Sequence, residues 1–110
     1  MKSLLFFSLM LLAAGKTSAA ETWHTSKVDR IYPVASGGFI LTFKVDHPSC
    51  NIGSSTKYYS VSEGKNGVSQ PAIANFLSVA LVAASSDKEL TISFDNESTT
   101  CDINRLFIKF

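Results

Sequence analysis

The fold of this chain is decided by residues 69–86, which read SQPAIANFLSVALVAASS. The apolar side chains that recur there at helical spacing are Ile73, Phe76, Leu77, Ala80, Leu81 and Ala84. This spacing places one apolar stripe along a helix. Pro71 fits the first turn, where its missing N–H leaves no helical hydrogen bond unmade. The segment predicts one amphipathic helix that begins at Ser69 or Gln70 and ends within residues 85–87.

On both sides of this helix the hydrophobic period changes from 3.6 to two, which is typical of strands. The predicted strands are Lys27–Val34, Phe39–Val45, Lys57–Ser62, Glu89–Phe94 and Asp102–Phe110. In the second of them, Phe39, Leu41, Phe43 and Val45 share the predicted core face. Three strands, a helix and two strands is the element order of the OB fold, a five-stranded Greek-key barrel. An open α+β sheet covered by one helix has the same order and is the alternative.

The first twenty residues have the three parts of a signal peptide: a charged start at Lys2, an apolar run over Leu4–Ala14 and a small-residue exit. Cleavage is predicted after Ala19 or Ala20. Because Lys16 ends the apolar run well short of the roughly 20 residues that span a bilayer, a membrane anchor is disfavoured. We therefore expect a secreted or periplasmic protein whose single domain comprises residues 21–110, with no membrane span after cleavage.

The chain has two cysteines, Cys50 and Cys101. If the protein is exported, they are expected to form a disulfide, because oxidising compartments form and keep disulfides. They are predicted to bond to each other, which leaves no thiol nucleophile. His24 and His47 are isolated, and no CxxC or HxxxH spacing occurs. The sequence therefore predicts neither a metal site nor a cofactor.

Charge and motifs limit the function further. The chain has ten basic and nine acidic residues, and loss of Lys2 and Lys16 with the signal leaves eight and nine. No cluster of Lys or Arg remains to attract nucleic acid. No catalytic motif occurs, and the carboxylates are scattered singly along the chain. These features predict a binding domain that is not an enzyme.

Candidate binding residues follow from the OB-fold expectation, since OB folds bind ligands on the face of strands two and three and on the loops that join strand one to two and strand four to five. The residues that meet this description are Ser36, Lys44, Tyr58 and Asn96. Trp23, near the predicted mature N-terminus, has two interpretations, either a packing plug or a stacking platform for a ligand.

The helix carries one more signal, because no charged residue occurs from Asn66 to Ser86. A helix that packs one stripe on a sheet normally presents a charged face to water. Small and mostly apolar residues lie behind the predicted stripe, at Ala72, Asn75, Val79, Val82 and Ala83. This strip predicts an oligomer interface. The alternative is that a loop, or the segment around Trp23, covers it within one chain.

The layout resembles a known group of proteins. A signal peptide, a short mature chain and the segments Val28–Pro33, Lys57–Tyr59 and Ala80–Ala84, together with the two cysteines, resemble small exported bacterial proteins of unassigned function. These in turn resemble the B subunits of A-plus-pentameric-B toxins of the subtilase cytotoxin type. The resemblance implies an OB-fold subunit that assembles in a ring around its helices and binds a glycan or a partner protein, including a catalytic subunit.

No segment of the chain matches a toxin sugar pocket residue by residue, so the resemblance assigns no glycan contacts. Fold alone does not give function. The first functional hypothesis is a non-catalytic, oligomeric binding subunit that recognises a surface glycan or a partner protein. The second is a monomeric periplasmic interaction or envelope-stress domain without sugar specificity.

Overall fold

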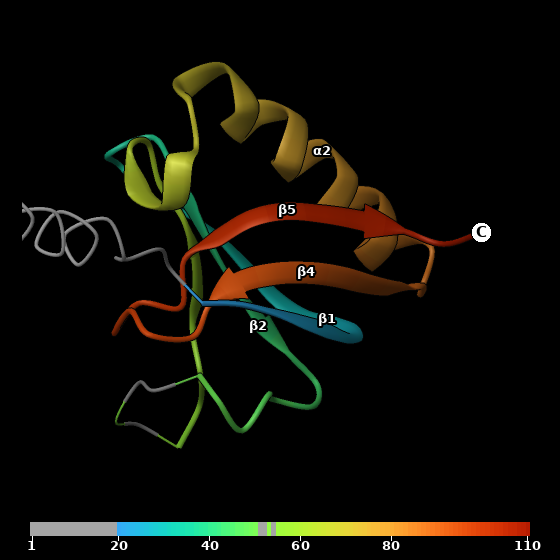
Figure 1. The fold of residues 1–110 in the computed structure, drawn as a ribbon. Coiled ribbons are helices and arrows are strands. Elements are labelled where there is room, and N and C mark those ends of the chain that lie inside the picture. Colours follow the sequence, from blue (N-terminus) through green and yellow to red (C-terminus); the bar gives the residue numbers. More distant parts are fainter. Residues whose placement is uncertain (1–19, 51–52, 54) are drawn as a thin grey trace, which may run out of the picture.

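The computed structural model describes residues 20–50, 53 and 55–110 (Figure 1). The predicted signal peptide, apart from Ala20, lies outside the described residues. The elements are β1 (Glu21–Pro33), β2 (Phe39–Phe43), β3 (Tyr59–Val61), the 3-10 helix η1 (Lys65–Gly67), α2 (Gln70–Ser85), β4 (Glu89–Asp95) and β5 (Ile103–Ile108). The prediction of a mainly β chain with one α-helix is confirmed.

The strands form one antiparallel sheet in the order β3-β2-β1-β4-β5, with β1 at its centre. Residues Glu21–Lys27 of β1 pair with β4, and residues Val28–Pro33 pair with β2. The predicted first strand, which begins at Lys27, is therefore too short. Its N-terminal half turns the polar side chains of His24 and Ser26 inward, so the sequence shows no alternation of apolar residues there.

The sheet is not closed into the predicted barrel. Its two edges meet at an isolated parallel bridge between Ser60 of β3 and Asp102, the residue that precedes β5. The Ser60 N–H also donates to the Cys101 carbonyl at 3.3 Å. Because β3 is only three residues long, it cannot form a continuous ladder with β5. The helix α2 packs on β5, β1 and β4, and Figure 1 shows it beside β5 on the side away from β4.

The core lies between the sheet and α2. Phe39, Leu41 and Phe43 of β2 are buried as predicted, but Val45 is 65% exposed because β2 ends at Phe43. The other buried apolar side chains of the strands are Tyr59, Val61, Leu90, Ile92, Phe94 and Ile103. These positions confirm the period-two reading of β2, β3 and β4.

The helix is rotated relative to the predicted stripe. Ile73 and Ala80 are buried as expected, and Phe76 and Leu77 pack against the core. Leu81, however, is 49% exposed and Ala84 is exposed, whereas Ala83 is fully buried. A shift of the stripe by one residue preserves a continuous apolar face, so spacing alone could not distinguish the two orientations.

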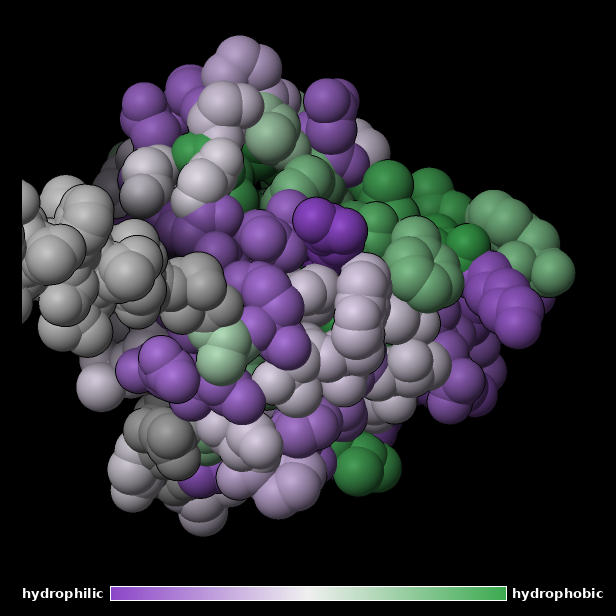
Figure 2. Space-filling model, in the orientation of Figure 1, coloured by the Kyte–Doolittle hydropathy of each residue, from purple (hydrophilic) through white to green (hydrophobic). Residues whose placement is uncertain are grey.

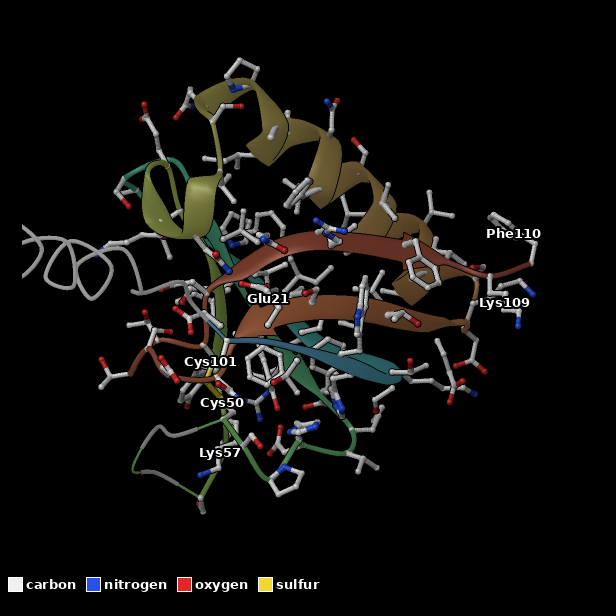
Figure 3. The ribbon with its side chains drawn as sticks, viewed as in Figure 1. Glu21, Cys50, Lys57, Cys101, Lys109 and Phe110 are labelled. Carbon is white, nitrogen blue, oxygen red and sulfur yellow. A yellow bond between two sulfur atoms is a disulfide. The ribbon has the colours of Figure 1, made fainter. Side chains whose placement is uncertain are left out.

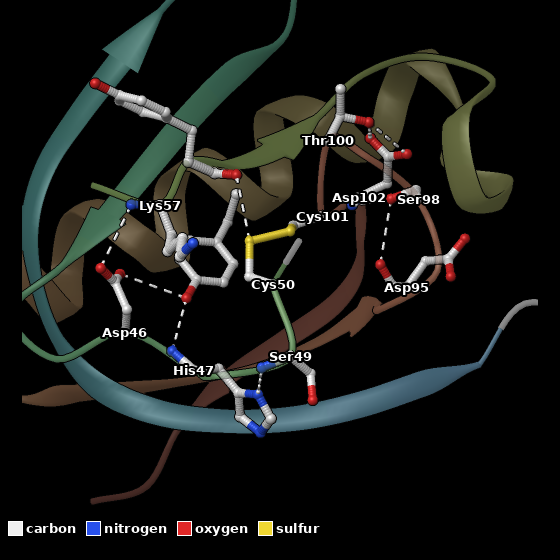
Figure 4. Close-up of a disulfide and its surroundings, with 12 residues drawn as sticks. Asp46, His47, Ser49, Cys50, Lys57, Asp95, Ser98, Thr100, Cys101 and Asp102 are labelled. Carbon is white, nitrogen blue, oxygen red and sulfur yellow. Dashed lines mark hydrogen bonds between the residues drawn. A yellow bond between two sulfur atoms is a disulfide. The ribbon is translucent and has the colours of Figure 1, made fainter. Parts of the chain in front are cut away.

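The predicted disulfide between Cys50 and Cys101 is confirmed, with a Cα–Cα distance of 5.7 Å (Figures 3 and 4). It joins the loop before β3 to the segment that leads into β5, and both cysteines are buried. A buried disulfide fits the predicted extracellular or periplasmic location. None of the described helices is long and apolar enough to cross a membrane.

Candidate functional site

The four predicted ligand residues do not form one site. Ser36 is exposed in the turn between β1 and β2, and Lys44 follows β2, where its Nζ donates to Asp29 Oδ1 at 3.2 Å. Asn96 lies between β4 and β5, and its Nδ2 donates to Thr22 Oγ1 at 2.8 Å. Ser36 and Asn96 thus lie beyond opposite ends of the thirteen-residue β1. The loop residues cannot contact one small ligand together.

Tyr58 lies beside Tyr32 on an aromatic surface. Its ring centroid is 6.2 Å from that of Tyr32. The two tyrosines line an open depression of about 470 Å³ together with Pro33, Val34 and Ile40. Among its lining side chains only the two tyrosine hydroxyls are polar, and the Tyr32 hydroxyl already accepts a 3.2 Å hydrogen bond from Arg30. This surface offers little hydrogen bonding to a polar ligand.

The outer face of β1, β4 and β5 carries a different arrangement. Trp23 of β1 is 50% exposed and Phe107 of β5 is 45% exposed, and their ring centroids are 6.0 Å apart. We call this pair the aromatic platform. The guanidinium carbon of Arg105 lies 5.9 Å from the centroid of the Trp23 ring, a cation–π contact that holds the indole in place. Because Trp23 is half exposed, it is not a buried packing plug.

The platform follows from strand alternation and register. In β1, Trp23 and Thr25 point outward because His24 and Ser26 are buried on the opposite face. Across the sheet, Trp23 pairs with Ser93, which in turn pairs with Arg105. Ser93 is 2% exposed beneath these larger side chains. The Ser93 hydroxyl donates a hydrogen bond to Glu21 Oε1 at 2.9 Å. Figure 3 shows that Glu21 lies at the end of the sheet opposite Lys109 and Phe110.

A polar depression of about 600 Å³ adjoins the platform at Phe107. Its other lining residues are Thr25, Lys27, Asp87, Lys88, Glu89, Thr91 and Lys109. The volume lies in the range of small-molecule sites. An exposed aromatic pair beside hydroxyl, ammonium and carboxylate groups can stack on an apolar ring face and hydrogen-bond the polar groups around it.

An apolar groove of about 390 Å³ lies between β5 and α2, and Phe107 lines it as well as the polar depression. Figure 2 shows hydrophobic residues gathered over the C-terminal ends of α2 and β5. Of the predicted interface residues, Val79 and Val82 line this groove, and Asn75 is exposed. Ala72 packs against the core, and Ala83 is fully buried. Ala83 therefore cannot contact a second copy, which corrects that part of the predicted interface.

The two histidines lie in a structural cluster at the loop after β2, with their ring centroids 5.5 Å apart. Figure 4 shows His47 in that loop. His24 Nε2 donates to the Val45 carbonyl at 2.8 Å, and burial lowers the pKa of His24. The His47 N–H donates to the Tyr59 hydroxyl at 2.9 Å, and burial raises the pKa of Tyr59 to about 12. Among residues 20–50, 53 and 55–110, no three His, Cys, Asp or Glu side chains could hold a metal ion. The hydrogen bonds of His24 and Tyr59 therefore hold the loop after β2 in place.

The sequence contained part of the signal for the platform. Arg105, Phe107 and Lys109 alternate with Leu106 and Ile108 in the last predicted strand, which placed Phe107 outward. The sequence did not show that Trp23 lies in a strand, or that β4 brings the rings of Trp23 and Phe107 together. No family model matches the chain, and no curated protein matches it in sequence.

Proposed function

We propose that this chain is an exported, non-catalytic binding subunit that captures carbohydrate on the aromatic platform. The observation that carries the proposal is the half-exposed Trp23 ring, held by Arg105 and paired with Phe107, whose ring is tilted by 55° from the indole. A sugar ring has an apolar C–H face that stacks on an indole, and its hydroxyl groups need donors and acceptors at the edge. The guanidinium of Arg105 and the hydroxyls of Thr25 and Thr91 supply these at the platform edge.

The proposal includes an OB-like fold. Its support is the central position of β1 between β2 and β4, the helix between β3 and β4, and the bridge that joins the two edge strands. OB folds accept oligosaccharides among their ligands. The platform, however, lies on β1, β4 and β5 rather than on the face of strands two and three, so this fold preference does not predict its position.

The proposal also includes assembly with further copies of the chain. Its support is the apolar groove beside α2, where Val82 is 47% exposed, together with the absence of charge from Asn66 to Ser86. Assembly would place several platforms on one particle. Weak single-site sugar binding then becomes strong capture at a surface that carries many glycans.

A glycan array on the purified protein, followed by calorimetry with each glycan bound, tests the binding proposal. Trp23→Ala is expected to weaken binding roughly tenfold or more, because truncation of a central aromatic anchor commonly costs about 2 kcal/mol or more. The matched control is Tyr58→Ala, which removes an aromatic ring from the separate depression that Tyr58 forms with Tyr32, Pro33, Val34 and Ile40. Equal melting temperatures of the two variants would show that both remain folded.

Two results would count against this site. If Tyr58→Ala and Lys44→Ala weaken binding while Trp23→Ala does not, the ligand lies on the face of β2 and β3 that the sequence predicted. If no glycan binds to the assembled protein, the carbohydrate function itself is wrong, and the hypothesis of an interaction domain without sugar specificity gains support.

A further inference from the structure

The outward side chains of β1, β4 and β5 form three rows across the strands. Cross-strand pairing aligns Trp23 with Ser93 and Arg105 in the first row. The second row is Thr25, Thr91 and Phe107, and the third begins with Lys27 and Glu89. Lys109 extends the third row, since it follows the last paired residue of β5. The platform therefore occupies the first two rows, and the polar depression begins at the second row and extends past the third.

The distance along the strands exceeds one sugar ring. Lys27 lies four residue steps along β1 from Trp23, which corresponds to about 13 Å of extended strand. A single pyranose on the platform leaves the depression of about 600 Å³ empty. The two surfaces are continuous, because Phe107 belongs to both.

Hydrogen-bond donors and acceptors lie next to one another in the polar depression. The Thr25 and Thr91 hydroxyl oxygens lie 2.8 Å apart, and Lys27 Nζ is 3.2 Å from Asp87 Oδ2. Glu89 stands in the row between Lys27 and Lys109. Each hydroxyl group of a sugar both donates and accepts, so neighbouring hydroxyls can bridge an ammonium and a carboxylate. With three lysines and two carboxylates among the lining residues, the depression is close to electrically balanced.

We propose that this depression is a second sugar subsite, and that the ligand is a neutral oligosaccharide of at least two units. One unit stacks on the platform, and the next lies in the depression with hydroxyl groups on Glu89 and its flanking lysines. This inference rests on the proposed carbohydrate function. It adds the minimum length of the ligand and its charge.

Calorimetry with a homologous series of one, two and three units of a neutral glycan that binds on the array tests the inference. The affinity is expected to rise roughly tenfold or more from one unit to two, because the second unit adds hydrogen bonds to charged groups. Glu89→Gln keeps the side-chain shape and removes the charged acceptor, so it should abolish most of that gain and leave single-unit binding unchanged. Trp23→Ala should weaken binding of every member of the series.

Glu63→Gln is the matched control, because Glu63 is exposed in the loop after β3, outside the depression. Equal affinities for one and two units, or an equal effect of Glu89→Gln on both, would overturn the second subsite while the Trp23 result still upheld the platform. Binding of acidic glycans alone would overturn the neutral ligand. If no glycan binds at all, this inference falls together with the proposed function.

Discussion

At the scale of single residues, Gly38 is a position where the fold leaves no room for a side chain. A Cβ atom there would lie 2.1 Å from the Val61 carbonyl oxygen. Val61 pairs with Phe39 in the ladder of β2 and β3, so it cannot move away without disturbing that pairing. Gly38→Ala is therefore expected to lower the free energy of unfolding by about 1–3 kcal/mol, the usual cost of overpacking. Urea denaturation measures this change.

Gly53→Ala is the control, because a Cβ at Gly53 would meet no atom of the described residues within 4 Å. Its unfolding free energy should stay within about 0.5 kcal/mol of the unsubstituted protein, as for most surface changes. Similar losses in both variants would show that steric contact at Gly38 is not the cause.

His24 makes the stability of the protein depend on pH. Burial, followed by repulsion from His47, lowers its pKa below the ordinary 6.5, against the raising effects of the Val45 carbonyl and Asp46. The unfolded chain therefore binds more protons than the folded chain as the pH falls below 6.5. The contribution of neutral His24 is complete above the unfolded-state pKa. It is lost as the pH falls from there toward the lower folded-state value.

His24→Gln keeps a donor for the Val45 carbonyl and removes the titrating group. Between about pH 7.5 and pH 5, the melting temperature of this variant should fall less than that of the unsubstituted protein. Carboxylates contribute to both curves equally, so the difference between the two slopes isolates His24. Parallel curves would contradict the role of His24.

At the scale of elements, the disulfide fastens the loop before β3 to the start of β5. The two cysteines are separated by 51 residues in sequence. Closing a loop of that length restricts the unfolded chain and is worth about 4 kcal/mol in the loop-entropy model. Replacing both cysteines with Ala should lower the unfolding free energy by about this amount, a large part of the margin of a small domain.

Chemical denaturation of the paired and double-Ala proteins measures this difference. For the paired protein, the intact mass should rise by the mass of two hydrogen atoms on reduction, which verifies its redox state. A double-Ala protein as stable as the paired one would show that the β3–β5 bridge and α2 hold this corner without the disulfide.

At the scale of the whole molecule, α2 presents an uncharged and partly apolar surface, on which the proposed assembly depends. Leu81 and Val82 are about half exposed, so no described part of the chain covers them fully. This exposure favours an interface over the alternative of intrachain cover. Light scattering should give a particle several times the mass of one chain. The Leu81→Glu, Val82→Glu double variant should be a folded monomer, since each new carboxylate would have to be buried without a partner.

Val79 also lines the groove but is not a suitable site for substitution, because it packs against the core and a charge there would perturb folding. Gln70→Glu provides the control, at the exposed first turn of α2, where a negative charge is favourable. An unsubstituted protein that stays monomeric at high micromolar concentration would contradict the interface and leave the apolar groove unexplained.

Local sequence determined the elements with strong periodicity. The helix over Gln70–Ser85 and the inward faces of β2 and β4 follow from the spacing of apolar residues. A period of 3.6 in a helix, or of two in a strand, places the apolar side chains on one face, where they can be buried together. The disulfide follows from the presence of only two cysteines in a chain expected to be exported. Each of these predictions needed only neighbouring residues or a single pair.

Tertiary structure decided what depends on distant partners. Pairing with β4 extends β1 back to Glu21, although the inward side chains there are polar. Packing on the sheet fixes the rotation of α2, burying Ala83 and exposing Leu81. The register of β1, β4 and β5 brings Trp23 next to Arg105 and Phe107, although Trp23 lies far from both in sequence. Sequence sets which side chains alternate, but only the long-range ladder determines which of them meet on one face.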